Sequence, residues 1–291
     1  MLATLSRVDV LPMPAGLGAE ITGVDLAGPV SDEVHARIVD AWHQYLVLRI
    51  RGQRLDDAQL MRFGRRFGEL ELSPSTEYTA NFGEMEGVPP EVTVVSNIVE
   101  DGKALGTLGA GEAYWHSDSS FIDKPPSASI LYGIEVPDSG GDTCFANMYA
   151  AYEALPDDVK ARIDGLRAIH SSAYTSAGAL RKGRTAPADV TQDPGPRHPL
   201  VRTHPETGRK ALYLGRRLNS YIVGLPIAES EALLDLLWSH ATREEFTWRH
   251  QWQRGDVLIW DNRCALHRRD AFDPSVRRLM HRVQVKGTTP V

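Results

Sequence analysis

Two histidines and one aspartate in this chain have the types and the spacing needed to hold a metal ion. His116 and Asp118 are two positions apart within the segment 114–121, and His267 lies far downstream. Side chains alternate between the two faces of an extended segment, so His116 and Asp118 would lie on the same face. If a second strand delivers His267, the set becomes two imidazoles and one carboxylate. This is the facial triad of non-haem Fe(II) oxygenases, which leaves coordination positions open for a cosubstrate and O2.

The His-x-Asp pair alone is weak evidence for a metal site. The chain has 10 histidines and 38 acidic residues among its 291 positions, so about one such pair is expected by chance. Taken alone, His267 is equally compatible with an ordinary buried histidine. Residues elsewhere in the chain that serve the same chemistry are therefore needed to support a metal site.

Two arginines downstream of His267 provide such support. On a strand, positions 278, 280 and 282 share one face, so Arg278 and Arg282 would point the same way. Two buried arginines near a metal site would be costly unless each met an anion. Arginine forms bidentate pairs with carboxylates, so these two are candidate binding sites for two acids. The alternative is that both are exposed at the surface.

The composition is that of an ordinary globular protein. The chain is 42% hydrophobic and 24% charged, with a formal net charge of −6. It has no basic block and no apolar run of the roughly 18 residues that span a bilayer, so we expect neither nucleic-acid nor membrane binding. The N-terminal segment lacks the apolar core of a signal peptide. Cys144 and Cys264 form no C-x-x-C pair, which predicts a cytoplasmic protein with two free thiols.

Helical and strand patterns alternate irregularly along the chain. Apolar residues at helical spacing predict helices over 32–44 (capped by Ser31), 56–67, 148–155, 157–165 and 228–242. Runs rich in β-branched and aromatic residues predict strands over 45–50, 92–96, 129–136, 211–214, 246–252, 257–260 and 278–285. Many strands with few flanking helices favour a β-rich α+β fold with a jelly-roll-like core over a βαβ array. No linker divides the chain, so we expect a single domain over residues 1–291.

One long stretch of the chain shows no clear element. Residues 171–199 are poor in apolar residues and rich in serine, glycine, proline and arginine. A long segment of this kind inside a compact protein is usually a functional lid or a mobile loop. We therefore predict a lid or mobile loop at about 171–199.

Ordered motifs along the chain resemble those of the taurine dioxygenase/2,4-dichlorophenoxyacetate dioxygenase family. The resembling segments are 115–121, 140–143, 149–155, 201–205, 260–263 and 277–282. With the segment 16–26 near the start, the resemblance covers nearly the whole chain. Several motifs in one order are far more specific than an isolated His-x-Asp pair. The resemblance implies a double-stranded β-helix with flanking helices, in agreement with the strand-rich pattern.

The resemblance also implies roles for individual residues. His116, Asp118 and His267 would ligate Fe(II), and Thr143 and Arg278 would hold the distal carboxylate of 2-oxoglutarate. The implied reaction uses O2 to decarboxylate 2-oxoglutarate to succinate and CO2, and couples this to hydroxylation of a substrate C–H bond. Related halogenases lack the carboxylate ligand and bind halide in its place, so the presence of Asp118 disfavours halogenation. The habit of the family leads us to expect a homo-oligomer, either a dimer or a tetramer.

The family's substrate contacts argue against taurine as the substrate. Taurine dioxygenases use a histidine and an asparagine to contact taurine, and the corresponding positions here are Ser73 and Glu112. The segments 95–103 and 115–121 are closer to enzymes that hydroxylate aryloxyalkanoates beside the ether oxygen. The hemiacetal product of those enzymes collapses to a phenol and a 2-oxo acid. The resemblance therefore favours a phenoxy acid, with an alkyl sulfonate, a sulfate ester or another carboxylate as the alternative.

Four residues are candidates for contacts with an anionic substrate. Arg282 occupies the position at which the family uses an arginine for the substrate's anionic group, and Asn97, Ser119 and Tyr221 are further pocket candidates. Those three side chains could equally support loops.

A zinc-dependent cupin-like hydrolase or isomerase is an alternative from another class, because two histidines and an aspartate also suit Zn(II). It offers no role for the cosubstrate residues. A non-catalytic binding module of the same fold is a third alternative, against which the intact ligand set argues.

Overall fold

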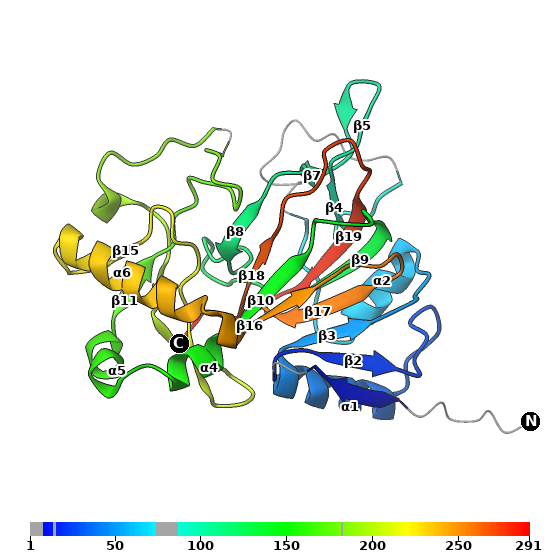
Figure 1. Cartoon of the computed structure of the whole chain (residues 1–291), viewed down its shortest axis with the longest axis horizontal. Helices are drawn as coiled ribbons and strands as arrows, with labels where there is room; N and C mark the ends of the chain where they lie inside the picture. The colour runs from blue at the N-terminus through cyan, green and yellow to red at the C-terminus, as the bar shows by residue number, and fades with distance from the viewer. Residues whose placement is uncertain (1–7, 14–15, 74–86, 182) are drawn as a thin grey trace, which may run out of the picture.

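Two β-sheets face each other and form the centre of the molecule (Figure 1). The computed structural model describes residues 8–13, 16–73, 87–181 and 183–291. In the larger sheet the strand order is β1 (Asp9–Pro12), β2 (Ala19–Thr22), β3 (Val47–Ile50), β17 (Val257–Asp261), β9 (Ala128–Glu135), β19 (Leu279–Val285), β4 (Thr93–Ser96) and β7 (Thr107–Leu108). In the smaller sheet it is β16 (Thr247–His250), β10 (Thr143–Asn147), β18 (Ala265–Arg269) and β8 (Ala113–His116). This pairing confirms the predicted jelly-roll core.

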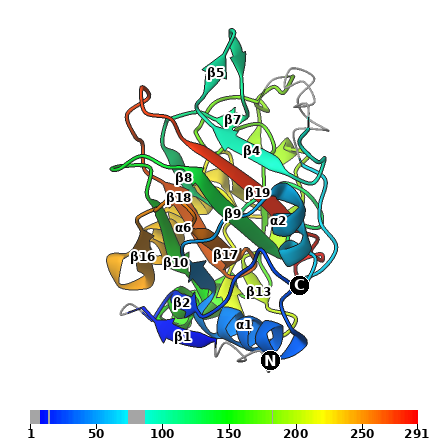
Figure 2. The same cartoon turned by 90° about the vertical axis from the view of Figure 1, so that its right-hand side faces the viewer.

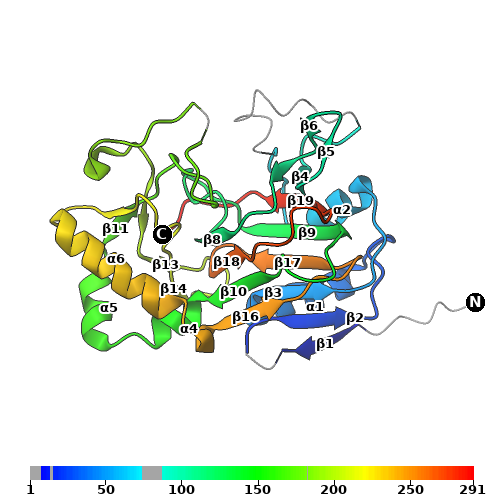
Figure 3. The ribbon, with the colours of Figure 1, turned by 45° about the horizontal axis from the view of Figure 1, so that its top comes forward.

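Short strands and helices surround the two sheets. A third sheet has the order β12 (Arg197–Pro199), β11 (Arg167–Ile169) and β15 (Tyr221–Ile222), and two strand pairs join β13 (Val201–Thr203) to β14 (Lys210–Leu212) and β5 (Val99–Glu100) to β6 (Lys103–Ala104). The helices are α1 (Asp32–Tyr45), α2 (Asp57–Gly64), α4 (Met148–Glu153), α5 (Asp157–Ile163) and α6 (Ile227–Ala241), with 3-10 turns at Val190–Gln192 and Glu244–Phe246. Figure 3 shows α5 and α6 on the side of the molecule opposite to α2.

Alternate residues of the central strand β17 face two different cores. Leu258 and Trp260 belong to the cluster between the two sheets, whereas Val257 and Ile259 pack with residues of α1 and α2. Because side chains alternate along a strand, a strand covered on both faces is apolar at every position. Figure 2 shows α1 and α2 outside the larger sheet. The polar site is consequently confined to the face that looks toward the smaller sheet.

Local sequence signals set the starts of α1 and α2. The Ser31 hydroxyl caps α1 by accepting a hydrogen bond from a first-turn backbone N–H (3.3 Å). Asp56 and Gln59 form a capping box at the start of α2. α2 ends at Gly64 rather than at the predicted Phe67, because the next residues form the tighter hydrogen bonds of single turns. The ends of the other predicted helices and strands differ from the structure by no more than two residues.

A buried ion pair joins the end of β17 to the loop between β13 and β14. Arg263 donates two hydrogen bonds to Asp261 (2.8 and 2.7 Å), and His204 Nε2–H donates a third (2.9 Å). Although burial opposes its ionisation, Arg263 and His204 hold the pKa of Asp261 well below its usual range. His204, Asp261 and Cys264 lie close enough to hold a metal ion. Arg263 already neutralises the carboxylate, however, so we interpret this cluster as a structural ion pair.

Replacing Asp261 with asparagine should lower the free energy of unfolding by about 3 kcal/mol, because the buried Arg263 then keeps only the half-exposed Glu206 as a counter-ion. Since the folded-state pKa is depressed, this stabilisation is present above the unfolded-state pKa of about 4 and is lost as the pH falls through the folded-state value. Urea unfolding at pH 7 measures the loss. The matched control is Glu229→Gln in the exposed pair with Arg162, which should change stability by less than about 1 kcal/mol. Equal losses in the two variants would contradict the prediction.

The two cysteines are structural residues of the interior. Cys144 and Cys264 are free thiols, as predicted, and both are buried. Burial raises the pKa of each thiol, so both stay protonated at neutral pH.

Among the helices that the structure describes, none combines the length and the apolar character needed to cross a membrane.

Candidate active site

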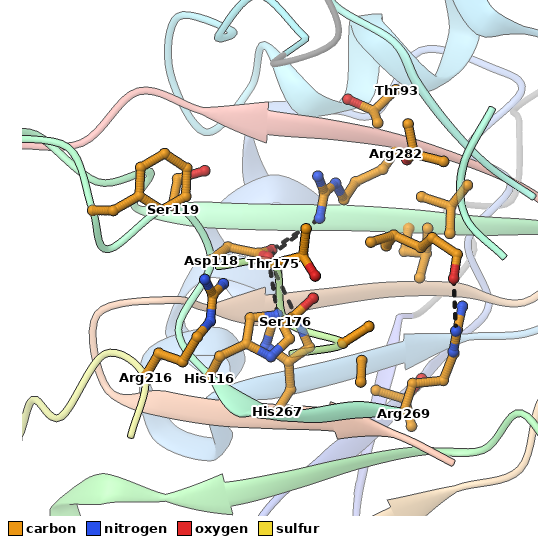
Figure 4. A pocket seen from close by; sticks show the side chains of 18 of the residues that line it. Thr93, His116, Asp118, Ser119, Thr175, Ser176, Arg216, His267, Arg269 and Arg282 are labelled. Atoms are coloured by element: carbon orange, nitrogen blue, oxygen red, sulfur yellow. Dashed lines mark hydrogen bonds and ion pairs between the residues drawn. The ribbon is translucent and has the colours of Figure 1, made fainter. Parts of the chain in front are cut away.

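His116 and His267 are register partners on the paired strands β8 and β18. Asp118 follows just after the end of β8, and its carboxylate points toward both imidazole rings (Figure 4). Asp118 Oδ1 is 3.6 Å from His116 Nε2 and 3.7 Å from His267 Nε2. One ligand atom from each of the three side chains lies within 4.8 Å of the others. The structure therefore brings the three residues together as one group, here called the His-Asp-His cluster.

Hydrogen bonding and burial prepare both imidazoles for metal binding. His116 Nδ1–H donates to the backbone carbonyl of Tyr114 (2.7 Å), which leaves the lone pair of Nε2 toward the other two side chains of the cluster. His267 packs against Trp260, with ring centroids 4.9 Å apart. Burial and, second to it, the nearby His116 lower the pKa of His267 to about 3, so its ring is neutral at pH 7. Neutral imidazole is the form that binds a metal ion.

Four side chains fix the position of Asp118. Ser129 Oγ and Gln284 Nε2 donate to its Oδ2 (2.7 and 3.2 Å), so Oδ1 faces the imidazoles. Arg282 Nη1 lies 3.2 and 3.3 Å from the two carboxylate oxygens. The Asn262 side chain accepts from the backbone N–H of Asp118 (2.7 Å) and donates to its carbonyl (2.9 Å). Burial opposes ionisation, but Arg282 and the two histidines hold the pKa of Asp118 well below its usual range.

The His-Asp-His cluster faces a cavity of about 380 Å³ between the two sheets. The other predicted site residues that line this cavity are Thr143, Arg278, Arg282 and Ser119. Asn97 and Tyr221 are not among the lining residues. The side-chain oxygen Oδ1 of Asn97 accepts from the backbone N–H of Arg278 (2.9 Å), and the Tyr221 hydroxyl donates to the backbone carbonyl of Leu225 (2.6 Å). The structure therefore places Asn97 and Tyr221 as supports for loops and not as pocket residues.

One end of the cavity can take an anion. The Arg278 side chain is 2% exposed, and its Nε has no hydrogen-bond partner among the described residues. Burial lowers the pKa of Arg278 to about 9, with a further contribution from the charge of Arg269. The Thr143 oxygen accepts a hydrogen bond from Trp252 Nε1–H (3.0 Å), which leaves the hydroxyl proton for another acceptor. A buried guanidinium beside a hydroxyl donor suits a carboxylate ligand.

The segment predicted as a lid forms part of the cavity wall. The residues of 171–199 that line the cavity are Thr175, Ser176, Ala177, Leu180, Arg181 and Arg184. The backbone N–H of Tyr114 donates to the carbonyl of Ser176 (2.8 Å), which joins this segment to β8. Residue 182 lies outside the described residues.

Two further arginines of the cavity wall, Arg216 and Arg269, were not predicted from the sequence. Arg269 follows His267 by two positions on β18, so strand alternation alone could have placed it on the inward face. Arg216 comes from a loop without any periodicity, and an isolated β-bridge to His116 holds it beside the cluster. Burial lowers the pKa of each arginine to about 10. Figure 4 shows the two on opposite sides of the His-Asp-His cluster.

Ser73 and Glu112, the positions at which the resemblance implies that taurine contacts are missing, are not among the residues that line the cavity. Ser73 is buried behind the wall, with its hydroxyl 2.8 Å from that of the lining residue Thr93. Glu112 lies 3.8 Å from Arg268, on the other side of the smaller sheet from the cavity. Neither side chain offers a contact for a sulfonate at the His-Asp-His cluster.

Two histidines and one carboxylate inside a jelly roll, next to a buried anion site, define the class of non-haem metal oxygenases. The chain belongs to the family described as "Taurine catabolism dioxygenase TauD, TfdA family", which matches residues 9–284. This result confirms the family that the sequence motifs indicated, and with it the dioxygenase class.

Characterised relatives are similar over almost their full length. The chain is 38% identical to the alpha-ketoglutarate-dependent 2,4-dichlorophenoxyacetate dioxygenase of Cupriavidus pinatubonensis, over 93% of this chain and 95% of the relative. It is 34% identical to the (S)-phenoxypropionate/alpha-ketoglutarate-dioxygenase of Sphingobium herbicidovorans, over 96% of this chain and 95% of the relative. The solved structure of AAD-2 in complex with Mn(II) and N-oxalylglycine is similar with a TM-score of 0.79 and 33% identity, covering 98% of this chain and 99% of that one. Other relatives of comparable identity are named pentalenolactone F synthase and sulfate ester dioxygenase.

Proposed function

We propose that this chain is an Fe(II)- and 2-oxoglutarate-dependent dioxygenase that hydroxylates an anionic small molecule, with an aryloxyalkanoate as the first candidate. The observation that carries the proposal is the presence of the His-Asp-His cluster and a buried anion site in one cavity. A zinc-dependent hydrolase or isomerase gives no specific reason for a threonine and a buried arginine at that position, whereas a 2-oxo dicarboxylate cosubstrate does. Membership of a dioxygenase family supports the same choice.

The metal ion would be held by Nε2 of His116, Nε2 of His267 and Oδ1 of Asp118. Two neutral imidazoles and a carboxylate are the donor set that Fe(II) takes in oxygenases of this type. Bound Fe(II) would supply the activation of O2, which amino-acid side chains do not provide. The role of the protein is to fix the three ligands, and the hydrogen bonds of Ser129 and Gln284 to Asp118 do this for the carboxylate.

The cosubstrate would be held by Thr143 and Arg278. Their contact with the distal carboxylate of 2-oxoglutarate would direct its 2-oxo acid end toward the His-Asp-His cluster. The two phenoxy acid relatives are both named as alpha-ketoglutarate-dependent, which is the same compound. In the overall reaction one oxygen atom of O2 enters succinate, CO2 is released, and the other oxygen atom enters a C–H bond of the substrate as hydroxyl.

The rest of the cavity can hold an aromatic ring and an anionic group. Phe121, Leu131 and Leu180 supply apolar surface. Arg216 Nη1 donates to the carbonyl of Tyr174 (2.6 Å), while its Nε has no partner among the described residues. We therefore assign the substrate anion to the side of the cavity that holds Arg216. Ser119 lies on the same side in Figure 4 and is a further candidate contact.

Arg282, which the family resemblance assigned to the substrate anion, has a second contact in this structure. Its Nη1 is engaged by Asp118, and its Nε is the atom without a partner among the described residues. We propose that Arg282 contributes to substrate binding through that Nε while it orients the carboxylate ligand. A substrate anion bound on the side of Arg216 would then also be attracted by Arg282.

Aryloxyalkanoates fit this arrangement because they join an aromatic ring to a carboxylate through an ether carbon. Hydroxylation of that carbon gives a hemiacetal, which collapses to a phenol and a 2-oxo acid. Alkyl sulfonates and sulfate esters are the alternative, because arginine also binds tetrahedral oxyanions well. The presence of a sulfate ester dioxygenase among the relatives keeps this alternative open.

Succinate release tests the proposed substrate class. Purified protein with Fe(II), O2 and 2-oxoglutarate is given phenoxy acids, alkyl sulfonates and sulfate esters in parallel. We expect a phenoxy acid to raise the rate about tenfold or more over the substrate-free rate, because a bound substrate completes the site. A larger increase with a sulfonate or sulfate ester would overturn the aryloxyalkanoate assignment and leave the oxygenase class intact.

The cellular setting and assembly are part of the proposal. We propose a cytoplasmic homo-oligomer, a dimer or a tetramer, with one domain over residues 1–291 and a lid at about 171–199. A net charge of −6 supports a small-molecule partner over nucleic acid. Light scattering after size-exclusion chromatography measures the assembly, and a monomeric mass would contradict the proposed oligomer.

A further inference from the structure

Two arginines lie against the same aromatic ring at one end of the cavity. The guanidinium carbons of Arg269 and Arg278 are 5.6 and 5.7 Å from the centroid of the Phe272 ring. Both side chains are buried, with 6% and 2% exposure. Both also line the same cavity. The two guanidinium groups therefore both flank Phe272 and add positive charge to this end of the cavity.

Neither arginine at this end of the cavity has an acidic counterpart among the described residues. No ion pair joins Arg269 or Arg278 to a carboxylate of the described residues, and the Nε atom of each has no hydrogen-bond partner there. The contrast is with Arg268, the neighbour on the other face of β18, which pairs with Asp270 and lies 3.8 Å from Glu112. Buried cations without a counter-ion are unfavourable, and a bound anion removes that penalty. The cavity end is thus prepared for a ligand with negative charge.

Arg269 shares its strand face with the metal ligands. On β18 it lies two positions after His267, and Thr143 is its register partner on the neighbouring strand β10. Thr143, Arg269 and Arg278 all line the same cavity. Figure 4 shows Arg269 beside this cavity, away from Arg216 and Ser119. Arg269 consequently lies at the end of the cavity assigned to the cosubstrate 2-oxoglutarate and not at the end assigned to the substrate that is hydroxylated.

Arg269 also holds a loop that borders the cavity. Its Nη2 donates to the backbone carbonyls of Leu108 (3.2 Å) and Gly111. Leu108 lines the cavity and has a φ of +78°, a left-handed conformation that is strained for a residue other than glycine. The backbone N–H of Phe272 donates to the carbonyl of Ala110 (3.3 Å). The Arg269 side chain and the backbone of Phe272 thus help to hold the segment 108–111, while Arg269 Nε has no partner among the described residues.

We propose that Arg269 is a second cosubstrate-binding residue, which joins Arg278 in holding the distal carboxylate and links its binding to the order of segment 108–111. This inference rests on the proposed use of 2-oxoglutarate. Two guanidinium groups at this end of the cavity favour a 2-oxo dicarboxylate over a 2-oxo monocarboxylate, because the second carboxylate is attracted by both charges. Since the same side chain holds the loop, cosubstrate binding and loop order stabilise each other.

Isothermal titration of the Mn(II)-loaded protein with N-oxalylglycine, an analogue of 2-oxoglutarate, tests the binding role without turnover. We expect Arg269→Gln to weaken binding about 10- to 100-fold, the size expected for lost hydrogen bonds to a charged group. Arg269→Lys keeps the charge and should lose less affinity. The matched control is Arg268→Gln on the opposite strand face, which should bind N-oxalylglycine like the unmodified protein.

Hydrogen exchange over residues 108–111 tests the link to the loop. N-oxalylglycine should slow exchange of these amides in the unmodified protein and in Arg268→Gln, but not in Arg269→Gln. The inference is overturned if Arg269→Gln binds N-oxalylglycine as tightly as the unmodified protein and if the analogue still slows exchange of these amides in the variant. Should that variant not fold, as judged by urea unfolding, Arg269→Lys decides by the same two measurements. If Arg278→Gln also binds N-oxalylglycine normally, the proposed cosubstrate site itself is wrong, whereas a loss confined to Arg278→Gln overturns only the role of Arg269.

Discussion

Replacing Asp118 with asparagine is expected to weaken metal binding by more than about 100-fold, since the loss of a residue that merely supports a metal ligand already costs about 10- to 100-fold. Asparagine keeps the shape of the side chain but removes the negative charge that neutralises a divalent ion. In this structure the carboxylate also lies 3.2 Å from Arg282 Nη1, and the variant leaves that cation unpaired beside the metal. Metal binding to the purified protein, measured by equilibrium dialysis with Mn(II), gives the affinity.

The control for this prediction is Asp123→Asn, the same substitution at an exposed position five residues further along the chain. It should bind Mn(II) like the unmodified protein. Urea unfolding of both variants without metal separates a loss of affinity from a loss of fold. If folded Asp118→Asn bound Mn(II) as tightly as the control, Asp118 would not be a ligand.

Replacing Arg278 with glutamine is expected to raise the KM for 2-oxoglutarate about 30-fold or more, because truncating one partner of a buried charge pair costs about 2–5 kcal/mol. The guanidinium is 2% exposed, so water cannot replace it as a partner for the distal carboxylate. The kcat at saturating 2-oxoglutarate should change far less, because Arg278 lies away from the reacting end. Initial rates of succinate release over a range of 2-oxoglutarate concentrations separate the two parameters.

Arg277→Gln is the matched control for Arg278. The Arg277 side chain is exposed and pairs with Glu135 on the outside of the sheet. Its loss should leave the KM for 2-oxoglutarate within about twofold, as expected for a surface ion pair. A KM that rises equally in both variants, or in neither, would show that the cosubstrate carboxylate is bound elsewhere.

Strand alternation predicted much of the site from the sequence. It placed His116 and Asp118 on one face, and it placed Arg278 and Arg282 on another, although Arg278 just precedes β19. His267 pairs with His116 across about half of the chain, and no local pattern predicts such a pairing. The residue types suggested His267 as a ligand, and the family resemblance supported it. Thr143 was predicted only from the family resemblance, since the sequence of β10 is not rich in strand-forming residues.

The substrate contacts were the part that the sequence could not supply. Asn97 and Tyr221 have types that suit a pocket, but both direct their polar groups to nearby backbone atoms. Arg216 reaches the cavity from a loop, where no period indicates which way a side chain points. Local signals such as the Ser31 cap act within a few residues and so appear in the sequence directly. The direction of a loop side chain depends on the packing of distant segments, which single-sequence patterns do not contain.

Labelling with ¹⁸O2 tests the central proposal most directly. Purified protein is incubated with Fe(II), 2-oxoglutarate and the compound that gives the greatest succinate release, and the succinate is analysed by mass spectrometry. We predict one ¹⁸O atom in each succinate, with formation that requires Fe(II) and stops when Zn(II) replaces it. Succinate without ¹⁸O, or product formed equally well with Zn(II) and no 2-oxoglutarate, would contradict an Fe(II)- and 2-oxoglutarate-dependent dioxygenase.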